Sequence, residues 1–398
     1  MGDSTPNFRS FPRLGSMATI EALYCHLPFC HTICPFCAFA VHGNRPALHR
    51  PYLDALKREI ALRATEYEGA RQPIEALYFG GGTPSTLALE AVQELLDWIA
   101  AHYGIGQAAE VAFEVNPEDA TPAYLRGLKS AGINRISLGL QSLDSATLAA
   151  LGRNHDAVQG RRALEALRGS GHENYNVDLL YGAPSVSERA FEEDLEHMAA
   201  ARPPHLSLYG LDLEEGTLFA RNGTVREWMA RHGPRQASQF LYASEFLTAQ
   251  GYRHYEVSNY CLPGREGRQN LVVWRGGNYL GFGTGAHSHR DGTRWHNERH
   301  LRTYQRRLEK DEPPVAYQEE LSGQKMANEG IMLALRQADG LDIPQWERRY
   351  GFSWAEGQSE IAERLRQEGK AHWNGAQLAL TPQGFLLADE ITTQLMLA

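Results

Sequence analysis

The sequence predicts an α/β fold built on a largely parallel sheet, and three observations support this. Short runs rich in β-branched and aromatic residues alternate with amphipathic stretches through the first half of the chain. About six such units follow one another, which is typical of a full or partial (β/α) barrel. The loops after the expected strands carry cysteines, glycines and polar side chains, as expected where strand ends form one functional face.

The first unit shows the pattern. Residues 20–29, IEALYCHLPF, suit a strand closed by Pro28, because proline cannot donate a hydrogen bond to a neighbouring strand. From Pro51 to Tyr67, apolar side chains recur at helical spacing on one stripe, which predicts a helix packed on the sheet. The stripe consists of Leu53, Leu56, Ile60, Ala64 and Tyr67.

The same alternation continues through five more units. Runs of β-forming residues predict strands at 74–80, 110–115, 135–140, 176–182 and 205–213. Amphipathic stretches between them predict helices at 89–103, 122–130, twice within 144–169, and near 187–200. Because the strands are separated by helices, they are expected to run parallel.

Composition excludes several classes of protein. The 398 residues, 42% of them hydrophobic, suffice for one large core and a smaller accessory domain. The net charge of −9 offers no basic surface for nucleic acid or an anionic membrane. No apolar run approaches the roughly 20 residues of a bilayer span, and no secretory signal is recognisable, so we expect a cytoplasmic protein. Residues 1–18 lack periodicity and are expected to form a disordered tail.

Four of the five cysteines lie between residues 25 and 37. An odd number of closely clustered thiols argues against a disulfide framework and for metal ligation or catalysis. Cys30, Cys34 and Cys37 form the pattern CxxxCxxC directly after the first expected strand. Cys25 lies on that strand and alternates away from its neighbours, so we expect it to be a buried structural thiol.

Two kinds of metal centre are consistent with three close thiolates. Zinc would need a fourth ligand, for which Cys25, His26, His31 and His42 are candidates. A [4Fe-4S] cluster normally takes four thiolates, so three would leave one iron open for a chelating cofactor. We consider the cluster the stronger hypothesis.

The loops after the later strands carry further candidates. In GGGTP, Gly81 and Gly82 would let the backbone approach a ligand closely and Thr83 would add a hydroxyl, although a tight turn before a helix explains the same residues. Glu114 and Gln141 end the third and fourth strands and offer hydrogen-bonding groups. A solvated loop carboxylate is the competing interpretation for Glu114.

Two charged residues complete the candidate set. Arg153 is a fork-like donor that suits a carboxylate ligand, and a surface helix arginine is the equally supported alternative. Asp178 lies in an otherwise apolar strand, where an unpaired charge would be costly, so we expect it to contact a ligand. Phe36 and Phe39 are expected to shield the cluster from solvent, although ordinary core packing also explains them.

CxxxCxxC after a first strand, followed by a second strand that ends in GGGTP, resembles the radical S-adenosylmethionine (SAM) family. The resemblance implies a [4Fe-4S] cluster on Cys30, Cys34 and Cys37, with the amino and carboxylate groups of SAM on the remaining iron. It also implies that an electron from the cluster cleaves SAM to a 5′-deoxyadenosyl radical, so a reductant such as flavodoxin or ferredoxin is an expected partner.

Further motifs narrow the resemblance. YCHLPFCHTICPFCAF, EVNP at 114–117, SLGLQS at 137–142 and VDLLYGAP at 177–184 resemble the group that contains oxygen-independent coproporphyrinogen III oxidases and HemW haem chaperones. The positions that match the SAM contacts of this group are Tyr24, Gly81, Glu114, Gln141, Arg153 and Asp178. Those that match the second SAM site of the oxidase are Phe36, Gly82 and Thr83.

Two sequence features separate the branches of this group. The oxidases have a further cysteine two residues after the third, and here that position is Phe39, which favours the chaperone branch. The chaperones normally contain HNxxYW, with a histidine tied to haem binding, whereas this chain has Gln269 and Val273 in place of the histidine and the tyrosine. An amide is a poor iron ligand beside imidazole. Candidates to replace the histidine are Cys261, His254 and His287.

The resemblance divides the chain into four parts. Residues 1–18 are the tail, 19–255 the core barrel, 256–305 a glycine-rich segment that covers the barrel mouth, and 306–398 a helical, winged-helix-like domain. Three hypotheses follow. We favour a haem chaperone that passes haem to an acceptor protein over a porphyrinogen oxidase or other radical SAM enzyme. A structural zinc protein is the third hypothesis, and GGGTP argues against it.

Overall fold

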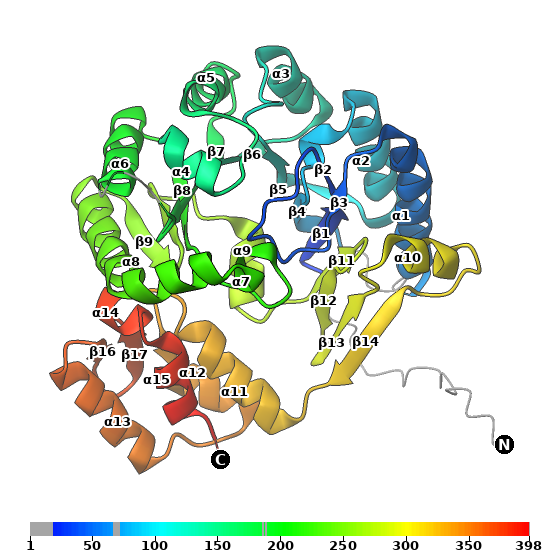
Figure 1. The fold of residues 1–398 in the computed structure, drawn as a ribbon. Helices are drawn as coiled ribbons and strands as arrows, with labels where there is room; N and C mark the ends of the chain where they lie inside the picture. Colours follow the sequence, from blue (N-terminus) through cyan, green and yellow to red (C-terminus); the bar gives the residue numbers. More distant parts are fainter. Residues whose placement is uncertain (1–18, 67–71, 185–186, 188, 398) are drawn as a thin grey trace.

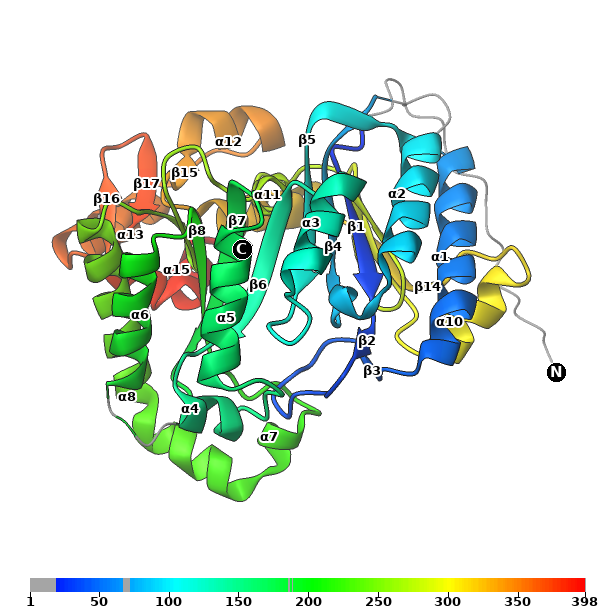
Figure 2. The ribbon, with the colours of Figure 1, turned by 90° about the horizontal axis from the view of Figure 1, so that it is seen from above.

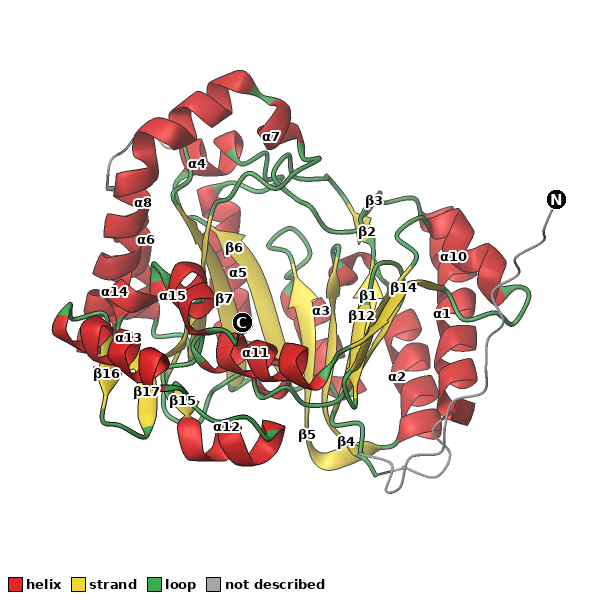
Figure 3. Ribbon diagram, turned by 90° about the horizontal axis from the view of Figure 1, so that it is seen from below, coloured by secondary structure: helices red, strands yellow, loops and turns green. Residues whose placement is uncertain are grey.

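A computed structural model describes residues 19–66, 72–184, 187 and 189–397. The expected tail at 1–18 and Tyr67 lie outside the described residues. The expected α/β fold is confirmed: a large, mainly parallel sheet is covered by helices on its outer face (Figures 1 and 3). Within the described ranges, every helix is too short or too polar to traverse a lipid bilayer.

Six consecutive parallel strands form the centre of the sheet, and neighbours along the chain are neighbours in space. They are β1 (Ala22–Leu27), β4 (Ile74–Gly81), β5 (Ile105–Val115), β6 (Arg135–Gln141), β7 (Asn174–Tyr181) and β8 (His205–Gly210). In the described part of the chain the sheet has twelve strands and ends at β9 on one edge and β14 on the other. Because these edges do not pair among the described residues, the barrel is partial.

The outer helices follow the expected order, and α2 has the predicted bounds. They are α1 (Pro46–Glu66), α2 (Leu89–Tyr103), α3 (Pro122–Ala131), α4 (Ser145–Ala150), α5 (Ala157–Arg168) and α6 (Ala190–Ala201). The predicted start of the first helix at Pro51 is wrong, because the helix begins at Pro46 and contains Pro51. Both prolines suit an early helical turn, and the apolar stripe alone does not distinguish them.

The barrel is extended at both edges. Beyond β8 lie β10 (Asn259–Cys261) and β9 (Arg253–Glu256). Beyond β1 lies the parallel strand β11 (Tyr279–Phe282), followed by three antiparallel strands. These are β12 (His287–Arg290), β13 (Thr293–Asn297) and β14 (Val315–Glu320).

The segment 256–305 divides between the two ends of the barrel. Its Gly285 lies beside Ala40, at the end where the cysteines are. The short helix α9 (Arg268–Trp274) lies at the opposite end, where Val272 packs against Ala22 and Ala76 at the starts of β1 and β4. Gln269 is on α9 and is buried, so the expectation that this whole segment covers the mouth is wrong for its motif-bearing part.

The C-terminal part forms a winged-helix-like unit with its own core, around Trp346 and Leu378. Phe240 on α8 (Gly223–Ala249) joins that core and ties the unit to the barrel. Figure 1 shows α8 beside the C-terminal unit. The helices are α11 (Gly323–Ala334), α12 (Ile343–Tyr350), α13 (Glu356–Gln367), α14 (Pro382–Phe385) and α15 (Ala388–Leu395). The strands are β15 (Leu341–Asp342), β16 (Ala371–Trp373) and β17 (Gln377–Leu380). The domain divisions at 255 and 305 stay predictions, and the second falls within α10 (Leu301–Leu308).

A buried carboxylate fastens the edge of the sheet to α1. Glu59 is 1% exposed and accepts hydrogen bonds from Gly283 N (2.8 Å), Asn297 Nδ2 (2.6 Å) and Tyr304 Oη (2.6 Å). Burial raises the pKa of Glu59 to about 7, against the opposing effect of these donors. Sequence reasoning missed this residue, although a charge next to Ile60 on an apolar helical stripe was a usable signal.

Glu59 should make the protein less stable as pH rises. Its raised pKa means that the folded state binds more protons than the unfolded state between about pH 4.5 and 7, so the free energy of unfolding falls across this window, by at most about 3 kcal/mol. Urea unfolding measured from pH 5 to 8 should therefore show a steeper decline in the free energy of unfolding for wild type than for Glu59→Gln. Glu90→Gln, at an exposed site on α2, is the control and should keep the wild-type slope. Parallel curves for wild type and Glu59→Gln would contradict the expectation.

Candidate functional site

The cysteine loop lies at the carboxyl end of β1, between two short parallel strands. Cys30 ends β2 (Phe29–Cys30), and the chain returns through β3 (His42–Gly43). Figure 2 shows β2, β3 and α7 (Leu218–Arg221) at one end of the barrel, with α12 at the other. A turn with a hydrogen bond from Cys37 N to Cys34 O (3.1 Å) sets the spacing of the last two thiols.

Hydrogen bonds to several elements hold this loop to the rest of the barrel. They join His31 to Asp119 (3.1 Å), Thr32 to Asn154 (2.7 Å), Pro35 O to Phe219 N (3.0 Å), Ala38 O to Arg299 (2.6 Å) and Ala40 O to His26 (2.9 Å). The loop is therefore fixed by partners from several elements along its length.

The three thiols fit a cluster better than a single metal ion. Cys30 is buried, Cys34 and Cys37 are half-buried, and all are free thiols. Burial, together with the neighbouring thiols, raises the pKa of Cys37 and raises the pKa of Cys30 to about 11. The thiolate forms of these residues therefore need a positively charged partner. Among the described residues, no three Cys, His, Asp or Glu side chains converge on one point as mononuclear zinc requires. An iron–sulfur cube binds each thiolate at a different iron.

The glycines at the end of β4 are required by close packing. Gly81 has φ +106°, and a Cβ there would lie 2.2 Å from His26 Nδ1. A Cβ on Gly82 would lie 2.6 Å from the carbonyl carbon of Pro28. The next residue continues this contact, because Thr83 N donates to Phe29 O (2.8 Å). The GGGTP turn therefore lies directly against the strand that leads to Cys30.

Glu114 is not a solvated loop carboxylate. It is half-buried and accepts hydrogen bonds from Tyr78 Oη (2.9 Å) and Gly81 N (3.1 Å). Burial, and then the nearby Asp178 charge, raises the pKa of Glu114 to about 7. The residue thus links the GGGTP turn to the end of β5.

Tyr24 and His26 connect the first strand to the cysteine loop. His26 Nε2 donates to the Ala40 carbonyl (2.9 Å), so Nδ1 accepts from the Tyr24 hydroxyl (3.0 Å). Burial lowers the pKa of His26 to about 4, which keeps the ring neutral. From the sequence alone, His26 is only a candidate zinc ligand. Its position in YCH, just before the cysteine motif, was the signal for this positioning role.

Asp178 has partners inside the sheet, so the argument from an unpaired charge was wrong. It accepts from Asn176 Nδ2 (2.6 Å) and Ser137 Oγ (3.1 Å). Asn176 Oδ1 in turn accepts from His205 Nδ1 (2.7 Å), and His205 Nε2 accepts from Tyr255 Oη (2.8 Å). Tyr255 Oη accepts from Gly267 N (3.2 Å), next to α9, so a buried hydrogen-bond chain crosses the barrel.

Gln141 and Arg153 lie on the same side as the cysteine loop. Gln141 has φ +67° at the end of β6, an uncommon backbone for a non-glycine residue and one that is found at functional sites. Arg153 donates to Asn116 Oδ1 (3.0 Å) and Gly139 O (2.9 Å), and Nη1 lies 3.5 Å from Cys34 Sγ. The surface-helix interpretation of Arg153 is therefore wrong.

The two phenylalanines differ from each other. Phe36 packs against Phe219 with ring centroids 6.1 Å apart. Phe39 is 69% exposed, so the expectation that it shields the cluster is wrong. Cys25 is fully buried in the main core, as expected for a structural thiol.

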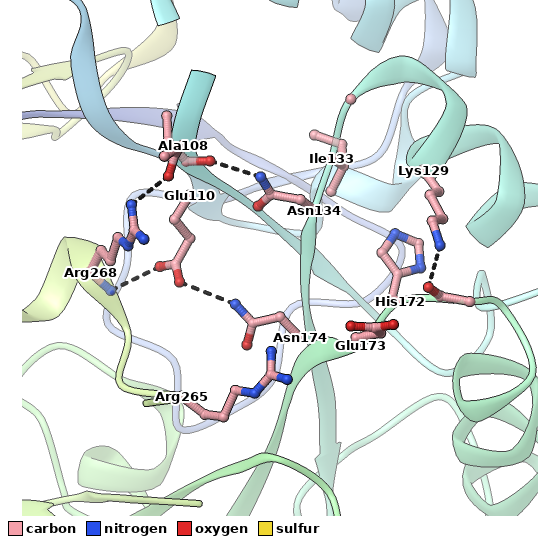
Figure 4. A pocket seen from close by; sticks show the side chains of 13 residues that line it. Ala108, Glu110, Lys129, Ile133, Asn134, His172, Glu173, Asn174, Arg265 and Arg268 are labelled. Carbon is pink, nitrogen blue, oxygen red and sulfur yellow. Dashed lines mark hydrogen bonds between the residues drawn. The ribbon is translucent and has the colours of Figure 1, made fainter. Parts of the chain in front are cut away.

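A cavity of about 460 Å³ lies far from this face. It is lined by residues of β5 and by residues just before β6 and β7, including Glu110, Asn134 and His172 (Figure 4). Glu110 is occupied there by hydrogen bonds from Arg268 N (2.9 Å) and Asn174 Nδ2 (3.3 Å). None of the sequence-predicted site residues lines this cavity, so it is not the candidate site.

Comparison with known proteins matches both parts of the chain. Residues 24–198 match the Radical SAM superfamily, and residues 321–387 match the HemN C-terminal domain. The chain is 34% identical over 380 residues to "Heme chaperone HemW" of Mycobacterium tuberculosis, covering 94% of each chain. The chain belongs to the HemW family of radical SAM proteins.

Other relatives agree with this membership. HemW of Lactococcus lactis is 30% identical over 380 residues, which cover 95% of this chain and 97% of the relative. A mouse protein is named "Radical S-adenosyl methionine domain-containing protein 1, mitochondrial". It is 36% identical over 279 residues, which cover 69% of this HemW-family chain and 62% of the mouse protein. The structure of Escherichia coli coproporphyrinogen III oxidase (HemN) shares the fold, with a TM-score of 0.79 at 23% identity, over 95% of this chain and 90% of that one.

Proposed function

We propose that this protein is a haem chaperone: it carries a [4Fe-4S] cluster, binds SAM and haem, and delivers haem to an acceptor protein. The observation that carries the proposal is the relationship to HemW chaperones over 94% of both chains, which includes the cysteine loop and the C-terminal unit. The expected cytoplasmic location is part of the same proposal.

The residues of the site support specific roles. Cys30, Cys34 and Cys37 would hold three irons of the cluster, which supplies an electron and an open iron when bound. Arg153, beside Cys34, brings a positive charge that offsets the thiolates and suits the SAM carboxylate.

The remaining predicted contacts surround the same end of the barrel. Gly81 and Gly82 leave no room for side chains, so the backbone of this turn can approach a ligand. Glu114 and Asp178 offer carboxylate oxygens for hydroxyl and amino groups. Tyr24 lies within β1, and Gln141 is the last residue of β6. Phe36 and Thr83 match a second SAM position in the oxidase, and we assign them to the walls of the same site.

A porphyrinogen oxidase is the second candidate function. The shared fold with the oxidase and the loss of the motif histidine at Gln269 favour it. Phe39 at the position of the additional oxidase cysteine argues against it. We therefore rank it below the chaperone.

One experiment separates the two functions. Reduced, cluster-loaded protein is incubated anaerobically with SAM and coproporphyrinogen III, and in parallel with haem followed by an apo-cytochrome acceptor. We expect haem binding and transfer, with no decarboxylated porphyrinogen above the level of a Cys30→Ala control. SAM-dependent formation of protoporphyrinogen would replace the chaperone proposal with the oxidase.

A further inference from the structure

Three residues were candidates to replace the missing motif histidine as a haem ligand, and their surroundings differ. Cys261 is fully buried in β10, and burial raises the pKa of its thiol to about 12. His254 is enclosed by Tyr260, stacked at 4.1 Å, and by Phe385 at 5.3 Å, and its Nδ1 is hydrogen-bonded to Ser244. His287 is exposed, and among the described residues neither of its ring nitrogens has a hydrogen-bond partner. Only His287 is accessible to a large ligand.

His287 has a second imidazole beside it. His296 lies directly opposite on β13, and the two ring centroids are 5.1 Å apart. Tyr317 on β14 lies opposite His296 and stacks on it at 5.8 Å. The ring of His296 is already oriented: Nδ1 donates to the Asn297 carbonyl (3.2 Å), which leaves Nε2 with the free lone pair that a metal requires.

The three rings lie on the face of the sheet that continues the barrel interior. Tyr24 points toward Glu114 inside the barrel and is paired in register with Gly281. Counting along β11 and across β12 to β14, the side chains of His287, His296 and Tyr317 fall on this same face. The imidazole pair is therefore on the concave side, near the cysteine loop.

The surroundings suit a flat, anionic macrocycle. Arg299 contacts the cysteine loop through Ala38 O (2.6 Å). Phe39, 69% exposed, and Tyr317, 52% exposed, offer apolar ring surface, and Arg299 offers a cation for a propionate.

We propose that the pair His287 and His296 binds haem iron through a single axial imidazole. This inference rests on the proposed chaperone function and names its ligand site. Both rings rise from one face of one sheet, so they approach the iron from the same side and only one of them can ligate it. The opposite side of the iron then stays open to a ligand from the acceptor protein.

The test is titration of the full-length, cluster-loaded protein with ferric haem, followed by difference absorption in the Soret region and by EPR. Wild type should give a five-coordinate, high-spin ferric signal. The double variant His287→Ala/His296→Ala should lose that signal and bind haem at least about tenfold more weakly. The double variant His287→Gln/His296→Gln is also measured, because its polar side chains protect against a failure of the alanine pair to fold. It should lose the same signal and bind haem as weakly as the alanine pair.

Controls separate this site from other histidines. His197→Ala, at an exposed position on α6, should leave the haem spectrum unchanged. Gln269→His should also leave it unchanged, because residue 269 is 8% exposed at the opposite end of the barrel. A gain in affinity or a six-coordinate spectrum in Gln269→His would place haem at α9 and overturn the inference.

The outcomes distinguish the inference from the function. Haem binding by wild type with an unchanged spectrum in both double variants would overturn the site and leave the chaperone proposal standing. Absence of haem binding by wild type would overturn both. A cross-strand imidazole pair also suits a single transition-metal ion, so Zn²⁺ is titrated in parallel. Loss of Zn²⁺ binding in the double variants with unchanged haem spectra would assign the pair to a metal ion and overturn the haem assignment.

Discussion

Anaerobic reconstitution of wild type will yield about four iron and four sulfide per chain, and alanine at Cys30, Cys34 or Cys37 will abolish stable cluster binding. In the proposed site each thiolate would hold a different iron, so the loss of one would leave two ligands for a cube that has no fourth. Iron and sulfide analysis, with EPR of the reduced protein, measures this effect. It is the largest that we expect, because SAM binding depends on the same cluster.

The matched control for this series is Cys25→Ala. Cys25 precedes the motif by five residues, but its side chain is fully buried in the core and faces away from the loop. This variant should keep its iron and sulfide with a modest loss of stability. Addition of SAM should change the EPR signal of the wild-type cluster, because the proposed site leaves one iron without a protein ligand. A triple variant of Cys30, Cys34 and Cys37 that retained its iron, or a wild-type signal indifferent to SAM, would contradict the assignment.

Gly81→Ala should be the most damaging single methyl addition near the site. The added Cβ would lie 2.2 Å from His26 Nδ1, at a backbone φ of +106° that L side chains rarely adopt. Overpacking and backbone strain each cost about 1–3 kcal/mol, so we expect a combined loss of roughly 3 kcal/mol or more in the free energy of unfolding. Displacement of His26 would also release Ala40 and loosen the cysteine loop, so cluster content should fall.

Gly43→Ala provides the comparison, because a Cβ there meets nothing within 4 Å, although Gly43 lies in β3 at the end of the same loop. It should keep cluster content and lose little stability. Urea unfolding and iron analysis of both variants measure the difference. Equal stability of the two variants would show that the packing of His26 against the turn is not limiting.

Sequence periodicity predicted most of the barrel because its strands are buried and short and its helices amphipathic. The bounds of α2 followed from its apolar stripe, whereas the start of α1 did not, because Pro46 and Pro51 both suit an early turn. The segment around Gln269 was placed at the mouth by analogy, yet α9 packs at the other end. The sequence of that segment alone does not indicate at which end of the sheet it packs.

The site was predictable where a residue type has few alternative uses. Spaced cysteines and consecutive glycines were recognised, and they lie together around β1 and β4. Partners that come from distant strands could not be foreseen. Asp178 has Asn176 and Ser137 beside it, and Phe39 points outward, and both facts depend on how neighbouring elements pack.

The hydrogen-bond chain from Gly267 to Asp178 runs in one sense only. Each member donates a hydrogen bond to the next member in the direction of Asp178. The chain runs through Tyr255, the neutral ring of His205 and Asn176. Reversing one link would set two donors or two acceptors against each other, so no member can be exchanged for a group of opposite polarity on its own. Natural variants of this protein should therefore keep His205 and Tyr255 together or replace both at once.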